Sequence, residues 1–309
     1  MNTSGMLKIR GIFRLLRVKQ YYKNLIMLVG IFFAGKLFQF SLYPKIFLGF
    51  VVLCLSSSII YILNDIRDLS ADQFHPEKKK SRPLAAGILS VKFAWIILFV
   101  IILLDGLILY FLPPLFLFMV GLILLNGLLY NYFLKDVPFA DVIGLSTIYI
   151  WRALAGCILI DVSISPWLTI TVFLTALLLA TGKRIADLSL IGGNNASNHK
   201  KSYRAYTAKI LDKFLIIIAT SLFVVYTLYC VLGPSEATSI FALEKNLLIY
   251  STPIALFLIF RFIFLINNSP ELARRTEKLF FDKQMLIGAI LLVLLILSIF
   301  YINFDNIIK

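Results

Sequence analysis

Histidine and cysteine are scarce in this sequence of 309 residues, which has two histidines and three cysteines. Cys54, Cys157 and Cys230 lie far apart inside apolar runs, without metal-ligand spacing or a disulfide framework. We therefore expect packed, unreactive thiols. His75 lies among cationic residues beside a proline and His199 in a polar loop, so we assign proton transfer to neither.

Charged residues are also scarce. They make up 15% of the chain against about a quarter in soluble proteins, whereas hydrophobic residues make up 60%. Apolar runs of about 20 residues, the length that crosses a bilayer as a helix, recur along the chain. These runs do not alternate with period two, and in hydrocarbon only helices and closed barrels satisfy their backbone polar groups. The sequence therefore predicts an all-α, polytopic membrane protein.

We expect about nine transmembrane helices. Their approximate ranges are 24–42, 46–63, 93–112, 115–133, 139–160, 165–182, 212–232, 246–267 and 284–303. No linker, low-complexity tract or change in composition marks a second domain, so residues 1–309 are expected to form a single transmembrane domain. Residues 1–23 lack the apolar core of a cleavable signal peptide, and the first span is expected to act as its own insertion signal.

Acidic residues are outnumbered, with 16 Asp and Glu against 30 Lys and Arg and a net charge of +14. The excess lies before the first expected span and after the second, fourth, sixth and eighth. The opposite side has little beyond Lys45, Lys245 and Lys309. This positive-inside pattern predicts a cytoplasmic N-terminus and an outer C-terminus in the cell (inner) membrane. It also argues against nucleic-acid binding and favours attraction to anionic lipids and substrates.

An acidic cluster at the end of the second expected span is the strongest candidate site. Asp65, Asp68 and Asp72 are spaced i, i+3 and i+7, so they share one helical face. Three carboxylates on one face repel each other unless a cation lies among them, and such oxygen ligands suit Mg²⁺, which commonly bridges to substrate phosphates. We expect these aspartates to be catalytic metal ligands that help a diphosphate leave. The alternative is an ordinary solvated helix end.

Other charged residues support a phosphate site without defining it. The stretch 75–83, His-Pro-Glu-Lys-Lys-Lys-Ser-Arg-Pro, places phosphate-binding side chains directly after the acidic cluster, as is typical of a metal–diphosphate site. Arg152 lies mid-membrane in the fifth expected span, where it either faces a polar cavity or pairs with Asp105. Asp141 is either a favourable charge at a helix N-terminus or part of that cavity.

The pattern Asn-Asp-x-x-Asp-x-x-x-Asp at Asn64–Asp72 resembles the first aspartate-rich motif of the UbiA superfamily of membrane prenyltransferases. The longer string Asn64–Gly87 is similar to the branch that includes decaprenyl-phosphate phosphoribosyltransferase. Matches to that branch continue along nearly the whole chain, at 19–24, 130–135, 141–142, 152–156, 182–188, 269–272 and Asp282. The resemblance implies a UbiA-like helical bundle whose cytoplasmic loops cap a central cavity.

The resemblance also implies a set of substrate-binding residues. They are Lys19, Lys23, Asn64, Arg67, Lys78, Arg82, Lys135, Asp141, Arg152, Lys183, Arg184 and Asp187. Tyr203 lies either at the membrane interface, where tyrosine is enriched, or against a ribose, and we include it in the set. The implied reaction is Mg-dependent transfer of phosphoribosyl from 5-phosphoribosyl 1-diphosphate to a polyprenyl (decaprenyl-type) phosphate, releasing pyrophosphate, in the synthesis of cell-envelope arabinan precursors. An anionic phosphate is already nucleophilic, so positioning and charge neutralisation carry the rate without a strong general base.

The sequence departs from the family pattern at two places. Asp187 replaces the glutamate of the branch, and Tyr21 or Tyr22 replaces a tryptophan. The second long cytoplasmic loop also lacks the Asp-x-x-x-Asp that UbiA enzymes using prenyl diphosphates usually carry, and offers Lys183, Arg184 and a single carboxylate.

Two other functions remain open. A UbiA-type prenyltransferase with a prenyl diphosphate donor and an aromatic acceptor has the same fold, but it is expected to have a second pair of metal-binding carboxylates. A lipid-phosphate transporter without chemistry is expected to have polar residues that continue to the outer face, whereas here charge gathers on the cytoplasmic half.

Overall fold

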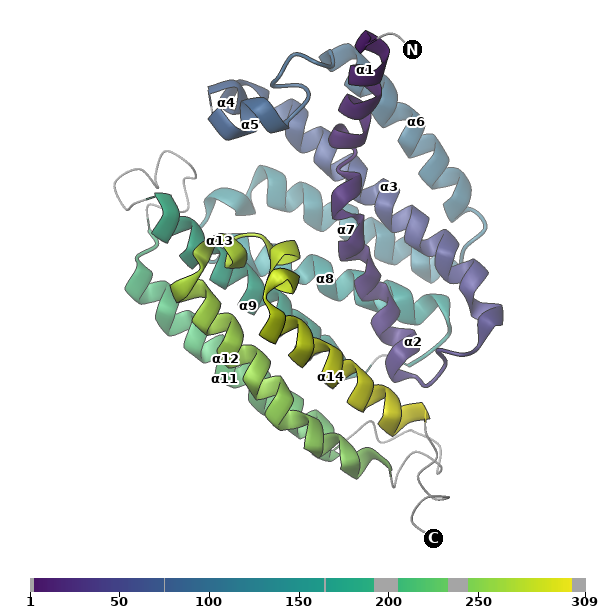
Figure 1. The fold of residues 1–309 in the computed structure, drawn as a ribbon. Coiled ribbons are helices and arrows are strands. Elements are labelled where there is room, and N and C mark those ends of the chain that lie inside the picture. Colours follow the sequence, from purple (N-terminus) through teal and green to yellow (C-terminus); the bar gives the residue numbers. More distant parts are fainter. Residues whose placement is uncertain (1–2, 75, 164, 192–204, 233–243, 302–309) are drawn as a thin grey trace. The chain divides into compact units, whose positions relative to one another are not determined.

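The computed structural model describes residues 3–74, 76–163, 165–191, 205–232 and 244–301. Every regular element within these ranges is a helix, which confirms the predicted all-α class (Figure 1). The α-helices are α1 (Thr3–Leu15), α2 (Val29–Phe33), α3 (Tyr43–Arg67), α4 (Leu69–Phe74), α5 (Pro76–Ser81), α6 (Val91–Leu109), α7 (Pro114–Tyr132), α8 (Ala140–Leu159), α9 (Pro166–Ile191), α11 (Ala208–Leu232), α12 (Thr252–Asn268), α13 (Pro270–Ala273) and α14 (Lys283–Tyr301). Short 3₁₀ helices are η1 (Val18–Leu28), η2 (Phe40–Leu42), η3 (Leu134–Asp136), η5 (Glu244–Ser251) and η6 (Thr276–Phe281).

Eight helices in the described part of the chain are long and apolar enough to cross a membrane. They correspond to the second to ninth expected spans, so the protein is a multi-span membrane protein. The first expected span, 24–42, is not one long helix: η1 and α2 cover it as far as Phe33, and η2 at its end continues into α3. Helix η1 has 11 residues that rise about 2.0 Å per residue, and α2 has 5 that rise about 1.5 Å per residue. Together the two helices extend over roughly 30 Å, the thickness of the hydrocarbon core. The expected count of nine spans is therefore approximate.

Several helices begin where the sequence places a proline or a capping hydroxyl. Helices α7, α9 and α13 begin at Pro114, Pro166 and Pro270, because proline has a helical φ and its missing N–H is not needed in the first turn. Helix α6 follows Ser90, whose side chain accepts a hydrogen bond from the Phe93 N–H at 3.3 Å. Local chemistry thus determines where these helices start.

Packing divides the chain into two compact units. Unit 1 consists of Met1–Asn131 and Trp151–Ser163, and unit 2 of Tyr132–Ile150 and Ile164–Lys309. The boundary falls inside α8, whose first half belongs to unit 2 and whose second half belongs to unit 1. That residues 1–309 form a single domain stays a prediction.

In unit 1, α3 packs against α6 around a core that includes Leu15, Ile62 and Leu98. The second half of α8 lies directly against η1, because a Cβ on Gly156 would be 1.9 Å from the carbonyl oxygen of Met27. Only glycine allows the two backbones to approach so closely.

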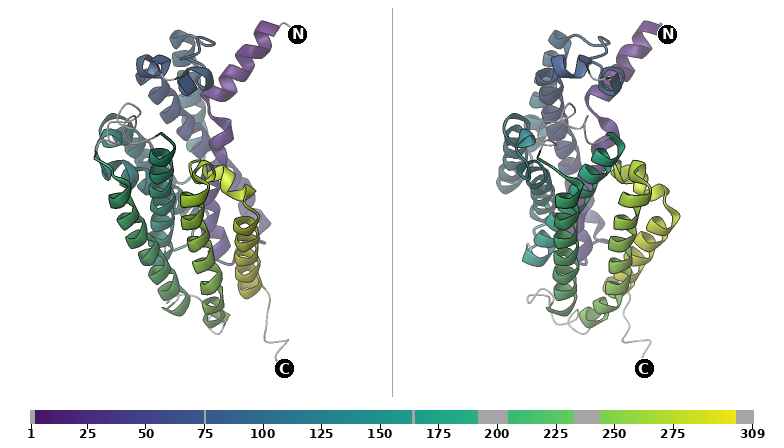
Figure 2. Two further views of the ribbon diagram at one scale, coloured as in Figure 1. Left: turned by 60° about the vertical axis from the view of Figure 1, so that its left-hand side comes forward. Right: turned by 90° about the vertical axis from the view of Figure 1, so that its left-hand side faces the viewer.

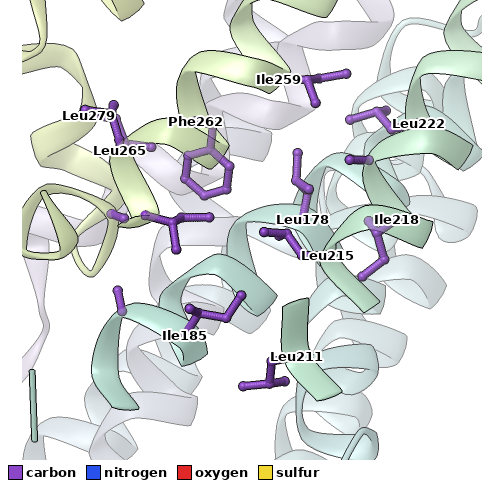
Figure 3. Close-up of a cluster of buried hydrophobic side chains, with 14 of the residues drawn as sticks. Leu178, Ile185, Leu211, Leu215, Ile218, Leu222, Ile259, Phe262, Leu265 and Leu279 are labelled. Atoms are coloured by element: carbon purple, nitrogen blue, oxygen red, sulfur yellow. The ribbon is translucent and has the colours of Figure 1, made fainter. Parts of the chain in front are cut away.

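In unit 2, α9 packs along α11, and α12 packs beside α14 (Figures 1 and 2). Their apolar faces meet in a cluster to which α9, α11 and α12 all contribute side chains, Phe262 among them (Figure 3). A Cβ on Gly182 would be 2.6 Å from the Phe262 ring, so this glycine lets α9 approach α12. The close packing holds the C-terminal end of α9 in place, and the candidate site residues Arg184 and Asp187 are in that end.

Candidate functional site

The acidic motif lies where α3 passes into α4. Helix α3 ends at Arg67, and Asp68 follows as its C-cap. The Asp68 N–H donates to the Asn64 carbonyl at 2.9 Å, and the Asp72 N–H donates to the Asp68 carbonyl at 2.9 Å. Because these are helical i to i−4 bonds, the motif keeps nearly the helical spacing that the sequence predicts.

Two arginines meet the buried carboxylates of this motif. Asp65 and Asp72 are both buried. Arg82 Nη1 lies 3.2 Å from Asp65 Oδ1, and the same nitrogen donates to Asp72 Oδ2. Arg17 Nη2 donates to Asp65 Oδ1 at 2.5 Å. We call Arg17, Asp65, Asp72 and Arg82 the Asp65 cluster; all four belong to unit 1.

Arg17 was missed as a site residue, because the sequence presents it as one of several positive charges before the first span. It adopts a left-handed conformation with φ 52°, at the junction of α1 and η1. Its guanidinium lies over the ring of Tyr61, 4.5 Å from the centroid, a cation–π contact. This conformation and this contact direct Arg17 onto the end of α3.

The carboxylate oxygens of the Asp65 cluster are atoms of the type that bind divalent cations. Asp65 Oδ2 is buried and has no hydrogen-bond partner among the described residues, and such an atom is costly unless a cation or donor reaches it. All candidate ligands are carboxylate oxygens, which suit Mg²⁺. In the described part of the chain, however, no three Asp, Glu, His or Cys side chains converge as metal ligands, and Arg82 pairs with both Asp65 and Asp72. That Asp65, Asp68 and Asp72 hold a metal ion stays a prediction.

The second group of candidate residues lies on a helix and not in a loop. Helix α9 continues to Ile191, nine residues beyond the expected end of that span, so Lys183, Arg184 and Asp187 are helical. Arg184 and Asp187 are buried and Lys183 is exposed. Residues three apart share a face of a helix and adjacent residues do not, which separates Lys183 from the other two.

Ion pairs connect this end of α9 with α8 and α13. Arg184 Nε donates to Asp141 Oδ2 at 3.0 Å, and Arg184 Nη1 lies 3.9 Å from Asp187 Oδ2. Arg274, the C-cap of α13, places its Nε 2.7 Å from Asp187 Oδ1. Arg274 is not among the predicted site residues, so its pairing with Asp187 is an unexpected contact.

Tyr206 completes this group and was also missed, because a tyrosine close to a membrane span is ordinary at the membrane interface. Its hydroxyl donates to Asp141 Oδ1 at 2.5 Å and accepts from the Phe139 N–H at 2.6 Å. Burial, together with the hydrogen bond to the Asp141 carboxylate, raises the pKa of Tyr206 above its ordinary value, so the hydroxyl keeps its proton. We call Asp141, Arg184, Asp187, Tyr206 and Arg274 the Asp141 cluster; all five belong to unit 2.

Arg152 does not pair with Asp105. Arg152 Nη2 donates to Ser57 Oγ at 3.2 Å, and Ser57 Oγ lies 3.4 Å from Asn24 Oδ1, so Arg152 belongs to a buried polar network of unit 1. Asp105 accepts a hydrogen bond from Ser56 at 2.8 Å. The alternative that Arg152 pairs with Asp105 is therefore wrong.

The remaining predicted substrate-binding residues are not gathered into either cluster. Lys19 and Arg67 are exposed, and Lys23, Asn64 and Lys135 are partly buried. The Lys23 ammonium donates to Gln20 Oε1 at 3.3 Å. Tyr203 and the side chain of Lys78 lie outside the described residues.

Comparison with known proteins agrees with this architecture. The sequence model of the UbiA prenyltransferase family matches residues 24–283. Decaprenyl-phosphate phosphoribosyltransferase of Mycolicibacterium smegmatis is 30% identical over 225 residues, which cover 72% of this chain and 70% of that protein. The protein of the same name from Corynebacterium glutamicum is 31% identical over 230 residues, or 71% of this chain and 67% of that protein.

Solved structures are similar to this fold. A UbiA homolog from Archaeoglobus fulgidus bound to GPP and Mg²⁺ has a TM-score of 0.68 at 15% identity, covering 94% of this chain and 100% of that chain. A structure of digeranylgeranylglyceryl phosphate synthase has a TM-score of 0.57 at 17% identity, covering 96% of this chain and 98% of that chain. At these identities the likeness concerns the fold alone.

Proposed function

The chain belongs to the UbiA prenyltransferase family, and from this premise we propose that it transfers phosphoribosyl from 5-phosphoribosyl 1-diphosphate to a polyprenyl (decaprenyl-type) phosphate. It is a membrane-embedded transferase. The observation that carries the finer proposal is the Asp141 cluster, in which Arg184 and Arg274 pair with Asp187, the single carboxylate at the position of the family's second motif. A site of this kind suits an anionic phosphate group better than a second metal ion. The names of the two curated relatives support the same substrates.

The Asp65 cluster is proposed to receive the diphosphate. Asp65, Asp68 and Asp72 would hold Mg²⁺, consistent with the unpartnered buried oxygen of Asp65. When bound, Mg²⁺ supplies neutralisation of the charge on the leaving diphosphate. The guanidinium groups of Arg17 and Arg82 pair with Asp65. We propose that they also donate to phosphate oxygens, which arginine binds with two parallel N–H groups.

The reaction itself needs little from the protein beyond position and charge. An oxygen of the lipid phosphate forms a bond to ribose C1, the bond from C1 to the diphosphate breaks, and the electron pair leaves with pyrophosphate. The lipid phosphate is anionic at neutral pH, so no strong general base is required, and binding and electrostatic stabilisation carry the rate. Arg184, with Arg152 as a further candidate, is proposed to bind phosphate groups of the substrates.

The setting is proposed to be the cell (inner) membrane, in the synthesis of cell-envelope arabinan precursors. The distribution of basic residues supports a cytoplasmic N-terminus, a cytoplasmic site and an outer C-terminus. A soluble phosphosugar donor then reaches the site from the cytoplasm, and the lipid acceptor reaches it from the bilayer.

A reconstitution assay tests this proposal. Purified protein is incubated with Mg²⁺, labelled 5-phosphoribosyl 1-diphosphate and polyprenyl phosphate, and we expect label in the extracted lipid. The Asp68→Asn variant is expected to lose turnover while remaining folded, whereas Asp161→Asn, at an exposed aspartate of unit 1, is the matched control. Transfer from geranyl diphosphate to an aromatic acid, without labelled lipid, would show that the chain uses a prenyl donor.

A further inference from the structure

Tyr206 is placed to control a buried carboxylate. Asp141 is fully buried in the first turn of α8. One of its oxygens accepts from the Tyr206 hydroxyl and the other from Arg184 Nε, at 2.5 and 3.0 Å. A carboxylate with a donor on each oxygen has its orientation determined by both donors, because rotation breaks one of the two bonds.

The backbone around Phe139 is shaped for the same contact. Phe139 has a φ of 65°, in the left-handed region that non-glycine residues rarely adopt. In this conformation its N–H donates to the Tyr206 oxygen at 2.6 Å. Strained backbone of this kind persists when the surrounding structure enforces it and is often found at functional sites.

The ring of Tyr206 is held independently of its hydroxyl. Its centroid lies 5.3 Å from that of Phe139 in an edge-to-face contact, and the Phe139 ring makes a second such contact with Phe214 at 4.9 Å. Removing the hydroxyl alone therefore leaves the aromatic packing in place. The role of the hydroxyl can be separated from the role of the ring.

We propose that Tyr206 is a positioning residue for phosphate binding, which acts through Asp141 to hold the Arg184 guanidinium in the orientation that binds a substrate phosphate group. This inference deepens the proposed function and rests on it for the identity of the substrates. Tyr206 itself touches Asp141 and the Phe139 backbone, and Arg184 is the residue that contacts the phosphate.

The physical reason is competition for the charge of Arg184. With the Tyr206 hydrogen bond, one oxygen of Asp141 is already engaged, and Arg184 binds the carboxylate through Nε. Without it, Asp141 is free to turn and take two N–H groups of the guanidinium in the bidentate geometry that arginine and carboxylate prefer. Fewer guanidinium N–H groups then remain for the substrate phosphate.

The test compares Tyr206→Phe with a matched control, Tyr226→Phe. Tyr226 also lies in unit 2, and its hydroxyl is hydrogen-bonded to Ser251 Oγ at 2.6 Å, away from the Asp141 cluster. Removing a hydrogen bond to a charged group lowers the binding affinity by about tenfold. We expect Tyr206→Phe to raise the KM of one substrate by about this factor with kcat nearly unchanged, and Tyr226→Phe to leave both KM values unchanged.

The identity of the substrate whose KM rises shows which phosphate Arg184 binds. A rise for 5-phosphoribosyl 1-diphosphate assigns Arg184 to the donor, and a rise for polyprenyl phosphate assigns it to the acceptor. Unchanged KM values for both substrates overturn the proposal. So does an equal fall of kcat with no change in KM, which is the result expected if the hydroxyl only supports folding.

A double-mutant cycle tests the route through Arg184. In the Arg184→Lys background, the change Tyr206→Phe is expected to have no further effect on KM, because the group that Tyr206 positions is already altered. Additive effects of the two changes overturn the proposed route.

Direct binding separates this proposal from the proposed reaction. The affinities of wild type, Tyr206→Phe and Tyr226→Phe for Mg²⁺–pyrophosphate and for polyprenyl phosphate are measured by calorimetry, without turnover. If wild type transfers phosphoribosyl but Tyr206→Phe binds both ligands normally, the positioning role fails and the reaction stands. If wild type uses a prenyl donor but Tyr206→Phe alone loses affinity for a ligand, the reaction fails and the positioning role stands.

Discussion

The Asp65 cluster of unit 1 and the Asp141 cluster of unit 2 each combine two buried carboxylates with two arginines, yet Asp65 and Asp141 differ in how their two oxygens are satisfied. In the Asp65 cluster one buried oxygen, Asp65 Oδ2, has no hydrogen-bond partner among the described residues. The two arginine side chains there are 20% and 18% exposed. In the Asp141 cluster both oxygens of Asp141 accept hydrogen bonds, and the Arg184 side chain is 8% exposed.

This difference shows how similar residues prepare different chemistry. A buried carboxylate with an unused oxygen and partly exposed arginine partners is suited to exchanging an arginine for a metal ion. When a tyrosine donates to one carboxylate oxygen and an arginine donates to the other, the arginine is kept in one orientation. A site that binds an anion requires such a fixed donor. This contrast is the reason for proposing a cation at the first cluster and an anionic phosphate at the second. Four predictions test this contrast, in order of decreasing effect.

The largest effect is expected from Asp65→Asn, which keeps the shape of the side chain but removes its charge. Turnover should fall by roughly a hundredfold or more, which is the usual effect of removing one group that stabilises charge developing in the transition state. The dependence of the rate on Mg²⁺ concentration should also weaken. Initial rates measured over a range of Mg²⁺ concentrations check this. Normal rates with a normal Mg²⁺ response would remove the metal role of the Asp65 cluster.

Arg184→Lys should have the next largest effect. Lysine keeps the positive charge but has no planar fork to reach Asp141 and a phosphate together. Truncating one partner of a buried, hydrogen-bonded charge pair costs about 2–5 kcal/mol, so kcat/KM should fall at least tenfold, mainly through KM. The Mg²⁺ concentration for half-maximal rate should not change. A shift in that concentration would show that the two clusters do not divide their roles as proposed.

Arg274→Gln should have a smaller effect on the same cluster. The Arg274 side chain is 30% exposed, and partly exposed ion pairs contribute about 0–1 kcal/mol. We expect KM to rise less than about fivefold, with a thermal stability close to that of wild type. Loss of activity as large as that of Arg184→Lys would mean that Arg274 contacts substrate directly.

The smallest effect on activity is expected from Asp282→Asn, which breaks an ion pair outside both clusters. Arg261 donates to Asp282 at 2.6 and 3.0 Å, and the Met285 N–H also donates to this carboxylate. The Arg261 guanidinium holds the pKa of Asp282 below its ordinary value. The ion pair therefore stabilises the folded protein above the unfolded pKa of about 3.9, and this stabilisation is lost as pH falls through the folded pKa. The difference in Tm between wild type and Asp282→Asn should therefore be present at pH 7 and shrink in acid, with unchanged KM at pH 7. A difference in Tm that is independent of pH would exclude the charge of Asp282 as its cause.

Much of the fold could be predicted from the sequence. Long apolar runs identify membrane helices because a chain in hydrocarbon must bond its own backbone, and eight of the nine expected spans are long helices in the described part of the chain. The first span was harder to predict, because its 3₁₀ segment packs against Gly156, which lies far along the chain. The extension of α9 to Ile191 was also missed, because polar residues at a helix end resemble a loop.

The candidate site was only half visible in the sequence. Asp65, Asp68 and Asp72 stand out because their spacing is local and helical. Arg17, Tyr206 and Arg274 did not stand out, because each lies in a segment where a basic or aromatic residue is ordinary at a membrane surface. Their contacts appear only when distant segments fold together.

The amino-acid sequence by itself determined the membrane class, most of the helices and the presence of an acidic motif at the end of α3. These properties depend on hydropathy and on spacings within one or two helical turns. Only the tertiary structure decided which donors meet the carboxylates. Arg17 reaches Asp65 across 48 residues, and Tyr206 reaches Asp141 across 65. Hydrogen bonds and ion pairs act over a few ångströms in space, so the partners that distinguish the proposed metal site from the proposed phosphate site are determined by packing and not by separation along the chain.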